Sequence, residues 1–404
     1  METLFVALAV GGLIATLNGL RPLRLAPLRV PSFFVGWLTA ELAPQLLVLH
    51  ALVVAGFAVA HATTAAGLAW AAVTAAGLVK MIVDAQRAES VLDEALEDGL
   101  RDALPPKPDV SRTWPQLLVP FWMRHPDVVR VKNLSYGPYG RRNRLDVYHH
   151  KDKANLANAP VLVQIHGGGW VIGNKDQQGR PLMLHLAARG WVCVSINYRL
   201  SPRAKFPDHL VDVKRAIAWT RQHAPEFGGD PDFVVVTGGS AGGHLTAMAA
   251  LTGNDKEYQP GFEDADTSVQ GAVPYYGVYD MTNELGTRYG RQRLRSLVER
   301  MVFQARIDDD RTLFERGSPL LRAAIPTEVP PFFVIHGHSD TLVPVEEARE
   351  FVKALRSVSS EPVVYAELPG AQHAFDVFPS LRVTHVVRAV ERFLAAIHRA
   401  QART

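Results

Sequence analysis

Two patterns of apolar residues divide this chain into unlike parts. Residues 3–20, 43–60 and 63–79 are long apolar stretches without Asp, Glu, Lys or Arg. From residue 159 onward, short apolar runs typical of buried strands alternate with amphipathic segments of helical period. This alternation predicts a mostly parallel sheet with helices on both faces. We therefore expect an α/β domain that follows an N-terminal helical region.

The three apolar stretches indicate a membrane anchor. The 18 residues of stretch 3–20 are roughly enough to cross the ~30 Å hydrocarbon core of a bilayer. The other two are rich in Ala and Gly, which favour close helix contact within a membrane. A secretory signal peptide is disfavoured because only Met1 and Glu2 precede the first stretch, with no basic residue. A soluble, Ala-rich helical bundle stays open as an alternative.

Basic residues give the expected topology. Arg21, Arg24 and Arg29 follow the first stretch, Lys80 and Arg87 follow the third, and residues 61–64 contain no Lys or Arg. By the positive-inside rule, the arginine loop and everything after residue 80 are cytoplasmic. We expect a multi-pass protein of the cell membrane whose catalytic domain faces the cytoplasm.

Between the anchor and the α/β domain lies a connector. Residues 84–104 place apolar side chains at helical spacing, and the Pro-rich residues 105–108 end that helix. Residues 109–127 carry an aromatic cluster that fits a core, a membrane-facing surface or the lid of an apolar pocket. The expected division is 1–83 (transmembrane), 84–127 (connector and cap) and 128–404 (catalytic).

Within the last part, residues 128–134 and 144–148 predict a β-hairpin. The further expected strands are 161–165, 191–197, 233–236, 271–276, 332–335 and 363–368, and the expected helices are 176–189, 210–223, 241–251, 345–357 and 382–400. A polar, arginine-rich helical segment at 281–326 interrupts the alternation, so we expect an insertion that forms part of a lid.

Composition excludes two classes of function. The chain has 43 Lys and Arg against 40 Asp and Glu, a net charge of +3 without the clustered basic face of a nucleic-acid-binding protein. Its single cysteine, Cys193, excludes an intramolecular disulfide framework. Because Cys193 lies within an apolar run, where no turn would expose it, we disfavour a catalytic cysteine.

Two glycine-rich turns contain the candidate catalytic groups. Gly238-Gly239-Ser240-Ala241-Gly242 fits G-x-S-x-G, the strand-to-helix turn that exposes a nucleophilic serine. His166-Gly167-Gly168-Gly169-Trp170 fits the HGGG element that supplies oxyanion donors. Each follows a predicted strand. The backbone N–H groups of Gly168, Gly169 and Ala241 are the candidate donors, and together the motifs predict a serine hydrolase with Ser240 as nucleophile.

The acid and base are expected downstream, in the order Ser, Asp or Glu, His. Asp340 follows the predicted strand 332–335, and His373 lies in the loop after strand 363–368. Asp308, Asp309 and Asp310 form a charge run that is better explained as solvated, and Asp376 comes after His373. His336 and His338 are rivals that are better explained as orienting the Asp340 loop, and His385 is expected on the surface.

Residues 128–404 resemble the hormone-sensitive-lipase-like carboxylesterases of the α/β-hydrolase fold. The resemblance rests on the HGGGW block, residues 197–202 with Phe206-Pro207, the elbow with Gly243, the Asp340 loop and residues 370–375. It implies a Ser240–Asp340–His373 triad, an oxyanion hole from Gly168, Gly169 and Ala241, and no metal or organic cofactor. It also implies a cap from residues 105–127 and 281–326. The family usually has Asp where this chain has Gly239, and we expect altered local hydrogen bonding there rather than inactivity.

The expected activity is hydrolysis of small-molecule or lipid esters of apolar, short- to medium-chain acyl groups through an acyl-enzyme. Trp170 and the aromatic cluster 114–123 predict an apolar acyl pocket, and Tyr198 is a further candidate for its lining. Two alternatives remain: an amide hydrolase similar to arylformamidases, and a ligand receptor similar to plant hormone receptors of this fold. Those receptors have lost the histidine that this chain keeps as His373, so we disfavour the receptor.

Overall fold

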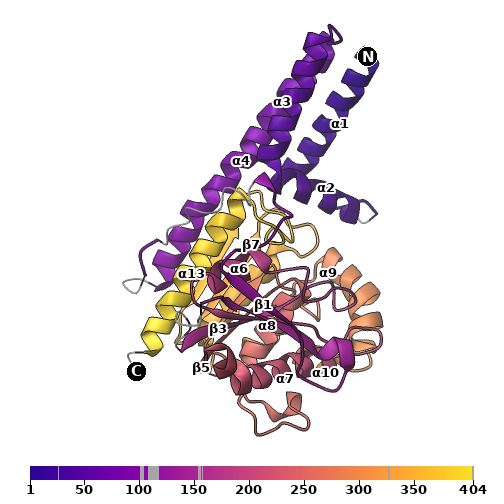
Figure 1. The fold of residues 1–404 in the computed structure, drawn as a ribbon. Helices are drawn as coiled ribbons and strands as arrows, with labels where there is room; N and C mark the ends of the chain where they lie inside the picture. Colours follow the sequence, from indigo (N-terminus) through magenta and orange to yellow (C-terminus); the bar gives the residue numbers. More distant parts are fainter. Residues whose placement is uncertain are drawn as a thin grey trace.

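A rod of helices projects from one end of an α/β domain (Figure 1). The computed structural model describes residues 1–25, 27–100, 104–107, 118–152, 156, 158–325 and 328–402. Residues 108–117 of the predicted cap segment, with Trp114 and Leu117, lie outside the described residues.

The domain is built on one eight-stranded sheet with the order β1-β2-β4-β3-β5-β6-β7-β8. The strands are β1 (Val128–Ser135), β2 (Arg144–His150), β3 (Ala159–Ile165), β4 (Val192–Ile196), β5 (Gly229–Gly239), β6 (Gly271–Tyr275), β7 (Phe332–Gly337) and β8 (Val363–Leu368). Strands β1 and β2 form the predicted hairpin, β2 pairs with β4 antiparallel, and the other pairings are parallel. The prediction of a mostly parallel sheet is confirmed.

Helices cover both faces of the sheet, as predicted. Helices α7 (Asp208–His223), α8 (Ala241–Leu251) and α12 (Val345–Val358) bury their apolar residues in one core. Helices α6 (Arg180–Ala187) and α13 (Leu381–Gln401), with the second half of α4 (Ala65–Leu100), fill the core on the other face. Short 3-10 turns complete the loops: η2 (Gly140–Asn143), η4 (Ala224–Phe227) and η5 (Lys256–Tyr258).

Helix α6 is shorter than the predicted helix 176–189. It begins at Arg180, after Gly179 in the left-handed region with φ 69°, and Pro181 occupies its first turn. A Cβ on Gly179 would lie 2.2 Å from Cδ of Gln164 on β3. The close approach of the backbone to the sheet therefore delays the start of the helix.

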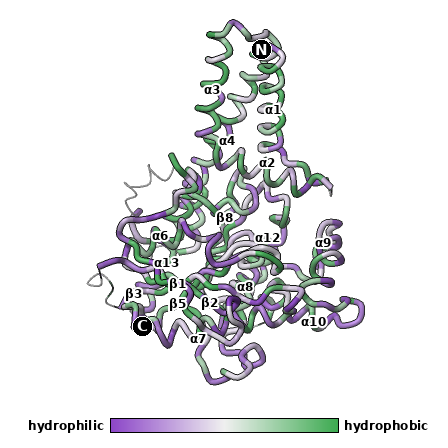
Figure 2. The backbone as a smooth tube through the Cα atoms, turned by 45° about the vertical axis from the view of Figure 1, so that its right-hand side comes forward, coloured by the Kyte–Doolittle hydropathy of each residue, from purple (hydrophilic) through white to green (hydrophobic). Residues whose placement is uncertain are grey.

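The rod contains α1 (Glu2–Leu20), α3 (Ala43–Val59) and the first half of α4, with α2 (Arg29–Glu41) across its base (Figure 1). Figure 2 shows that the rod is mostly hydrophobic. Among the described residues, α1 and α4 are each long and apolar enough to cross a membrane. Helices α2 and α3 pass this test only together and are bent by 84°, so there are two candidate spans, or three if that pair counts as one. These helices suggest membrane association.

Two details of the N-terminal region differ from the prediction. The third apolar stretch and the amphipathic connector form one continuous helix, the 36-residue α4, so the expected boundary at residue 83 falls inside a helix. Its Leu92 and Leu96 are buried in the catalytic domain's core. Helix α2 was not predicted. It connects α1 to α3 and lies between the rod and the domain (Figure 1).

A helical segment interrupts the sheet between β6 and β7, as predicted for residues 281–326. It contains α9 (Arg288–Arg293), the π-helix η6 (Leu294–Phe303), α10 (Arg311–Arg316) and α11 (Pro319–Arg322). Asp308, Asp309 and Asp310 are exposed on it, in agreement with a solvated charge run.

Candidate active site

Ser240 occupies a strained turn between β5 and α8. Its φ is 60° and its ψ is −120°, a backbone conformation that non-glycine residues adopt rarely and mainly at functional sites. The Ser240 amide donates to the Tyr275 carbonyl at 3.0 Å, which fixes the turn to the neighbouring strand β6. The predicted elbow is therefore present in the structure, with Ser240 partly exposed at its tip.

The HGGG turn lies directly beside this elbow. A Cβ on Gly167 would be 2.6 Å from the Gly239 carbonyl oxygen and 3.2 Å from Cβ of Ser240, so only glycine permits this approach. Gly168 and Gly169 have φ values of 114° and 61°. Among the described residues, no hydrogen bond uses the amides of Gly168, Gly169 or Ala241. These N–H groups are therefore available to an anion beside Ser240.

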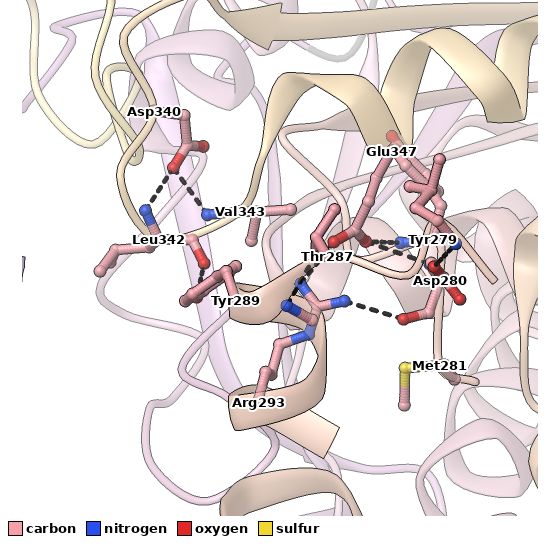
Figure 3. A network of polar contacts seen from close by, with 12 residues as sticks. Tyr279, Asp280, Met281, Thr287, Tyr289, Arg293, Asp340, Leu342, Val343 and Glu347 are labelled. Atoms are coloured by element: carbon pink, nitrogen blue, oxygen red, sulfur yellow. Dashed lines mark hydrogen bonds and ion pairs between the residues drawn. The ribbon is translucent and has the colours of Figure 1, made fainter. Parts of the chain in front are cut away.

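Asp340 and His373 are brought together from the loops that follow β7 and β8. Nδ1 of His373 lies 2.7 Å from Oδ2 of Asp340, and both residues are buried. The other carboxylate oxygen accepts from the amides of Leu342 and Val343, at 2.7 and 2.8 Å (Figure 3). Burial alone would raise the pKa of Asp340, but the charge of His373 and hydrogen bonds from His336 and His373 hold it well below its usual value. Asp340 therefore stays ionised beside the imidazole.

The rival histidines have other contacts. Nε2 of His336 lies 3.0 Å from the Val343 carbonyl oxygen and 3.3 Å from Oδ2 of Asp340, as expected for a residue that orients this loop. His338 pairs with Glu367 at 2.7 Å on the surface. The prediction that His385 lies on the surface is wrong. Its side chain is only 13% exposed because α4 covers α13 and brings Glu89 within 3.7 Å of it.

Tyr276 stands between the elbow and His373. The ring centroids of Tyr276 and His373 are 4.4 Å apart, and the Tyr276 hydroxyl donates to Asp376. Burial raises the pKa of Asp376 above its usual value. A Cβ on Gly239 would lie 2.5 Å from the Tyr276 hydroxyl oxygen, so the Tyr276 side chain fills the space beside Gly239. The described contacts include no hydrogen bond between Ser240 and His373.

The two residues expected in the substrate pocket lie behind the glycine turn. Trp170 is 1% exposed and packs edge-on against His244, with ring centroids 5.1 Å apart. Tyr198 is fully buried, stacks on His166 and donates to the His166 carbonyl at 2.9 Å. These contacts hold the HGGG turn in place on the side of the protein core. A role of Trp170 and Tyr198 in binding substrate stays a prediction.

Two further elements border the site. Phe33 of α2 packs edge-on against His373, with ring centroids 6.1 Å apart. From the helical insertion, Leu297 of η6 comes within 3.7 Å of the position a Cβ on Gly169 would take. The sequence analysis missed Phe33, because no strand-end loop or motif marks it.

A polar network holds the insertion against the Asp340 loop (Figure 3). The Tyr289 hydroxyl donates to the Leu342 carbonyl, and Nη1 of Arg293 lies 2.6 Å from Oε1 of Glu347 on α12. Glu347 also accepts from the amides of Tyr279 and Asp280, both at 3.1 Å. The network fixes α9 beside the loop that carries Asp340. Among the described residues, no group of three or more His, Cys, Asp or Glu could hold a metal ion.

The known proteins that this chain resembles are esterases. The family model BD-FAE matches residues 145–355, over half of the chain. The chain is 44% identical to the Mycobacterium tuberculosis protein named "Probable carboxylic ester hydrolase LipM", over 96% of this chain and 91% of that protein. It is 48% identical to esterase LipQ of the same organism, over 67% of this chain and 63% of LipQ.

A solved structure shows the same domain fold. The propionate-bound esterase 2 of the planctomycete Thermogutta terrifontis superposes with a TM-score of 0.56 and 27% identity, over 67% of this chain and 95% of that one. The chain therefore belongs to the hormone-sensitive-lipase-like carboxylesterases, a family of ester hydrolases with the α/β-hydrolase fold.

Proposed function

We propose that this chain is a membrane-anchored serine carboxylesterase whose triad is Ser240, His373 and Asp340. The observation that supports the proposal is the buried Asp340–His373 pair, which Tyr276 connects to the turn that holds the strained Ser240 and its unengaged amides. Among the described residues, Ser240 is the only serine with a positive φ.

The proposed reaction follows from these contacts. Oγ of Ser240 attacks the ester carbonyl while Nε2 of His373 takes its proton, and the amides of Gly168, Gly169 and Ala241 stabilise the oxyanion. The imidazolium then gives its proton to the departing alcohol. Water, activated by His373, releases the acid from the acyl-enzyme and restores Ser240. Asp340 remains a carboxylate throughout and holds Nδ1–H of His373.

The proposed substrates are esters of apolar, short- to medium-chain acyl groups. Esterase 2 of Thermogutta terrifontis has been solved with propionate and with butyrate bound, which supports short acyl groups for a similar fold. The same esterase has been solved phosphonylated by sarin, so a phosphonylating probe is a suitable reagent for this chain.

The test uses the detergent-purified full chain with p-nitrophenyl esters from acetate to palmitate. We expect hydrolysis that is strongest for short and medium chains, and complete loss in Ser240→Ala. The matched control is Ser357→Ala, which changes an exposed serine on α12. Activity of Ser240→Ala above a few per cent of wild type would overturn the proposal.

The proposed topology has three spans, with α3 as the second. Helix α1 ends and α4 passes into the catalytic domain at the same end of the rod, whereas the N-terminus and residues 61–64 lie at the far end (Figure 1). The arginine loop is thus on the side of the catalytic domain, and the positive-inside rule makes that side cytoplasmic.

A cysteine scan tests this orientation, because the native Cys193 is buried. In intact cells, a membrane-impermeant maleimide should label His61→Cys, in the turn between α3 and α4. It should label Ser357→Cys only after lysis. The reverse pattern would place the catalytic domain outside the cell.

A further inference from the structure

Helix α2 is apolar on both sides. One side packs on the protein through Phe33, Gly36 and Ala40, which are all buried. Another side exposes a stripe at helical spacing: Val30 is 54% exposed, Phe34 51% and Leu38 37%. A helix that is hydrophobic all round needs an apolar partner on each side, and the described residues supply a partner for only one.

The position of α2 identifies the second partner. Along the chain, helix α2 lies between the candidate span α1 and the apolar helix α3, and it turns by 84° from α3. Helix α3 runs along the rod, and α2 crosses the base of the rod (Figure 1). In a bilayer spanned by the rod, α2 would therefore lie close to the plane of the membrane. Its exposed stripe then faces the acyl chains of the bilayer.

A second apolar element lies next to α2. In the turn at residues 118–122, Phe121 is 64% exposed and Trp122 is 63% exposed. Phe121 contacts Phe378 with ring centroids 5.2 Å apart, and Phe378 contacts Trp37 of α2 at 5.3 Å. The Arg124 guanidinium lies 4.8 Å from the Trp122 ring. An exposed Trp paired with Arg is typical of the interfacial belt of membrane proteins.

Packed aromatic rings connect this surface to the catalytic histidine. The ring of Phe33 stacks on Trp37 at 5.7 Å and also contacts His373 at 6.1 Å. At the other end of α2, the Arg29 guanidinium lies 3.9 Å from the ring of Tyr289 on α9. Helix α2 therefore borders the active site on one side and exposes apolar side chains on another.

We propose that the ester reaches Ser240 from the bilayer, along α2 and the 118–122 turn. This inference rests on the proposed function and specifies the substrate class: an ester whose acyl chain is long enough to reside in a membrane. Each buried methylene stabilises membrane partitioning by about 0.8 kcal/mol, so a medium-length chain is sufficient. Phe34, Leu38, Phe121 and Trp122 contact the acyl chain outside the site, while the carbonyl is at the level of His373.

The experiment uses the full chain reconstituted in vesicles of phosphatidylcholine and phosphatidylglycerol. Two substrates with the same leaving group are compared: p-nitrophenyl decanoate dissolved in the bilayer and p-nitrophenyl acetate in water. The variant Phe34→Gln/Leu38→Gln makes the exposed stripe of α2 polar. The control variant Val129→Gln/Ile325→Gln changes two equally exposed apolar residues on β1 and after α11.

We expect the α2 variant to hydrolyse decanoate at least tenfold more slowly and acetate within twofold of wild type, and the control to match wild type on both. Unchanged decanoate turnover in the α2 variant, or an equal loss on both substrates, would overturn the inference. If the wild-type protein cleaves the acetate ester but not the decanoate ester, the inference is overturned while the proposed function remains intact. Wild type that cleaves neither would overturn the proposed function itself.

A second measurement tests membrane contact without relying on activity. Brominated lipids quench tryptophans that touch the bilayer. Quenching should fall in Trp122→Phe and stay unchanged in Trp219→Phe, which alters α7 on the catalytic domain. Equal quenching in wild type and Trp122→Phe would contradict the placement of the turn in the membrane surface.

Discussion

Oε1 of Glu41 lies 2.8 Å from Nε of Arg382, and both side chains are excluded from solvent. Glu41 belongs to the last turn of α2, whereas Arg382 begins α13 of the catalytic domain. Glu41 also accepts from Oγ of Ser380 at 2.6 Å, and Nη1 of Arg382 donates to the carbonyl of Pro369 at 2.6 Å. Helix α2 is thus joined through the Glu41–Arg382 ion pair to the loop that leads to His373.

Replacing Glu41 by Gln should destabilise the protein, because Arg382 would keep its buried charge without a partner. Such a change costs about 3 kcal/mol, or a fall of roughly 6 °C in the melting temperature. The matched change Glu89→Gln breaks a pair with Lys107 whose side chains are 42% and 52% exposed, and should leave the melting temperature within about 2 °C. Thermal unfolding of both variants in detergent checks this, and equal small shifts would contradict it.

Restoring the family's usual residue before the serine should reduce activity in this chain. In Gly239→Asp, the new Cβ would be 2.5 Å from the Tyr276 hydroxyl oxygen and would displace the ring that packs on His373. We expect a loss of at least about tenfold in kcat/KM, and a similar loss in Gly239→Ala, because both share the Cβ.

Gly56→Ala is the control for this prediction, since a Cβ there meets no atom within 4 Å. Steady-state kinetics with p-nitrophenyl butyrate measure the effect. If Gly239→Asp keeps wild-type activity, displacement of the Tyr276 ring does not affect kcat/KM, and Tyr276 does not position His373.

Asp340→Asn should lower kcat by about 10³-fold or more with little change in KM. The amide oxygen still accepts from the loop amides of Leu342 and Val343, but the charge that stabilises the imidazolium and fixes its tautomer is lost. The control is Asp309→Asn, on the exposed charge run of the insertion. A purified, folded Asp340→Asn enzyme with more than a tenth of wild-type kcat would argue against Asp340 as the partner of His373.

Buried neutral histidines should make the fold sensitive to mild acid. Burial lowers the pKa of His166 and His244 from 6.5 to about 4, and that of His209 to about 3. The unfolded chain binds these protons below about pH 6.5 while the folded protein does not, so stability falls as the pH drops from about 6.5 to 4. Each group accounts for about 3 kcal/mol over that range.

Melting temperatures between pH 7 and pH 4.5 test this prediction. His244→Gln keeps a donor for the Gly317 carbonyl, which His244 contacts at 2.8 Å, and should flatten the pH dependence. His61→Gln, at the exposed turn between α3 and α4, should not change it. An identical pH dependence in wild type and His244→Gln would show that His244 does not contribute to the loss of stability in acid.

Most of the catalytic fold could be predicted because its signals are local. Short apolar runs mark each strand. The close backbone approach in the two catalytic turns requires glycine, so residues 166–170 and 238–242 could be recognised in the sequence. The pairing of Asp340 with His373 follows from chain order in this fold class, and the structure places the two within hydrogen-bonding distance.

The elements that were missed depend on partners far away in the chain. Helix α2 has only 13 residues, and it exposes apolar side chains and buries polar ones, so its sequence shows neither a clear amphipathic period nor the length of a membrane span. The contact of Tyr276 with Asp376 joins residues 100 positions apart. Composition changes near residue 83 where α4 leaves the apolar rod, but no Pro ends the helix there, and it continues to Leu100.

The identity of the nucleophile is the central claim, and covalent labelling tests it most directly. The purified full chain would be treated with a fluorophosphonate, digested and analysed by mass spectrometry. The account predicts one adduct, on the peptide that contains Ser240, formed in parallel with loss of esterase activity and absent from Ser240→Ala. An adduct on another residue, or esterase activity that persists in Ser240→Ala and is abolished by the same reagent, would contradict it.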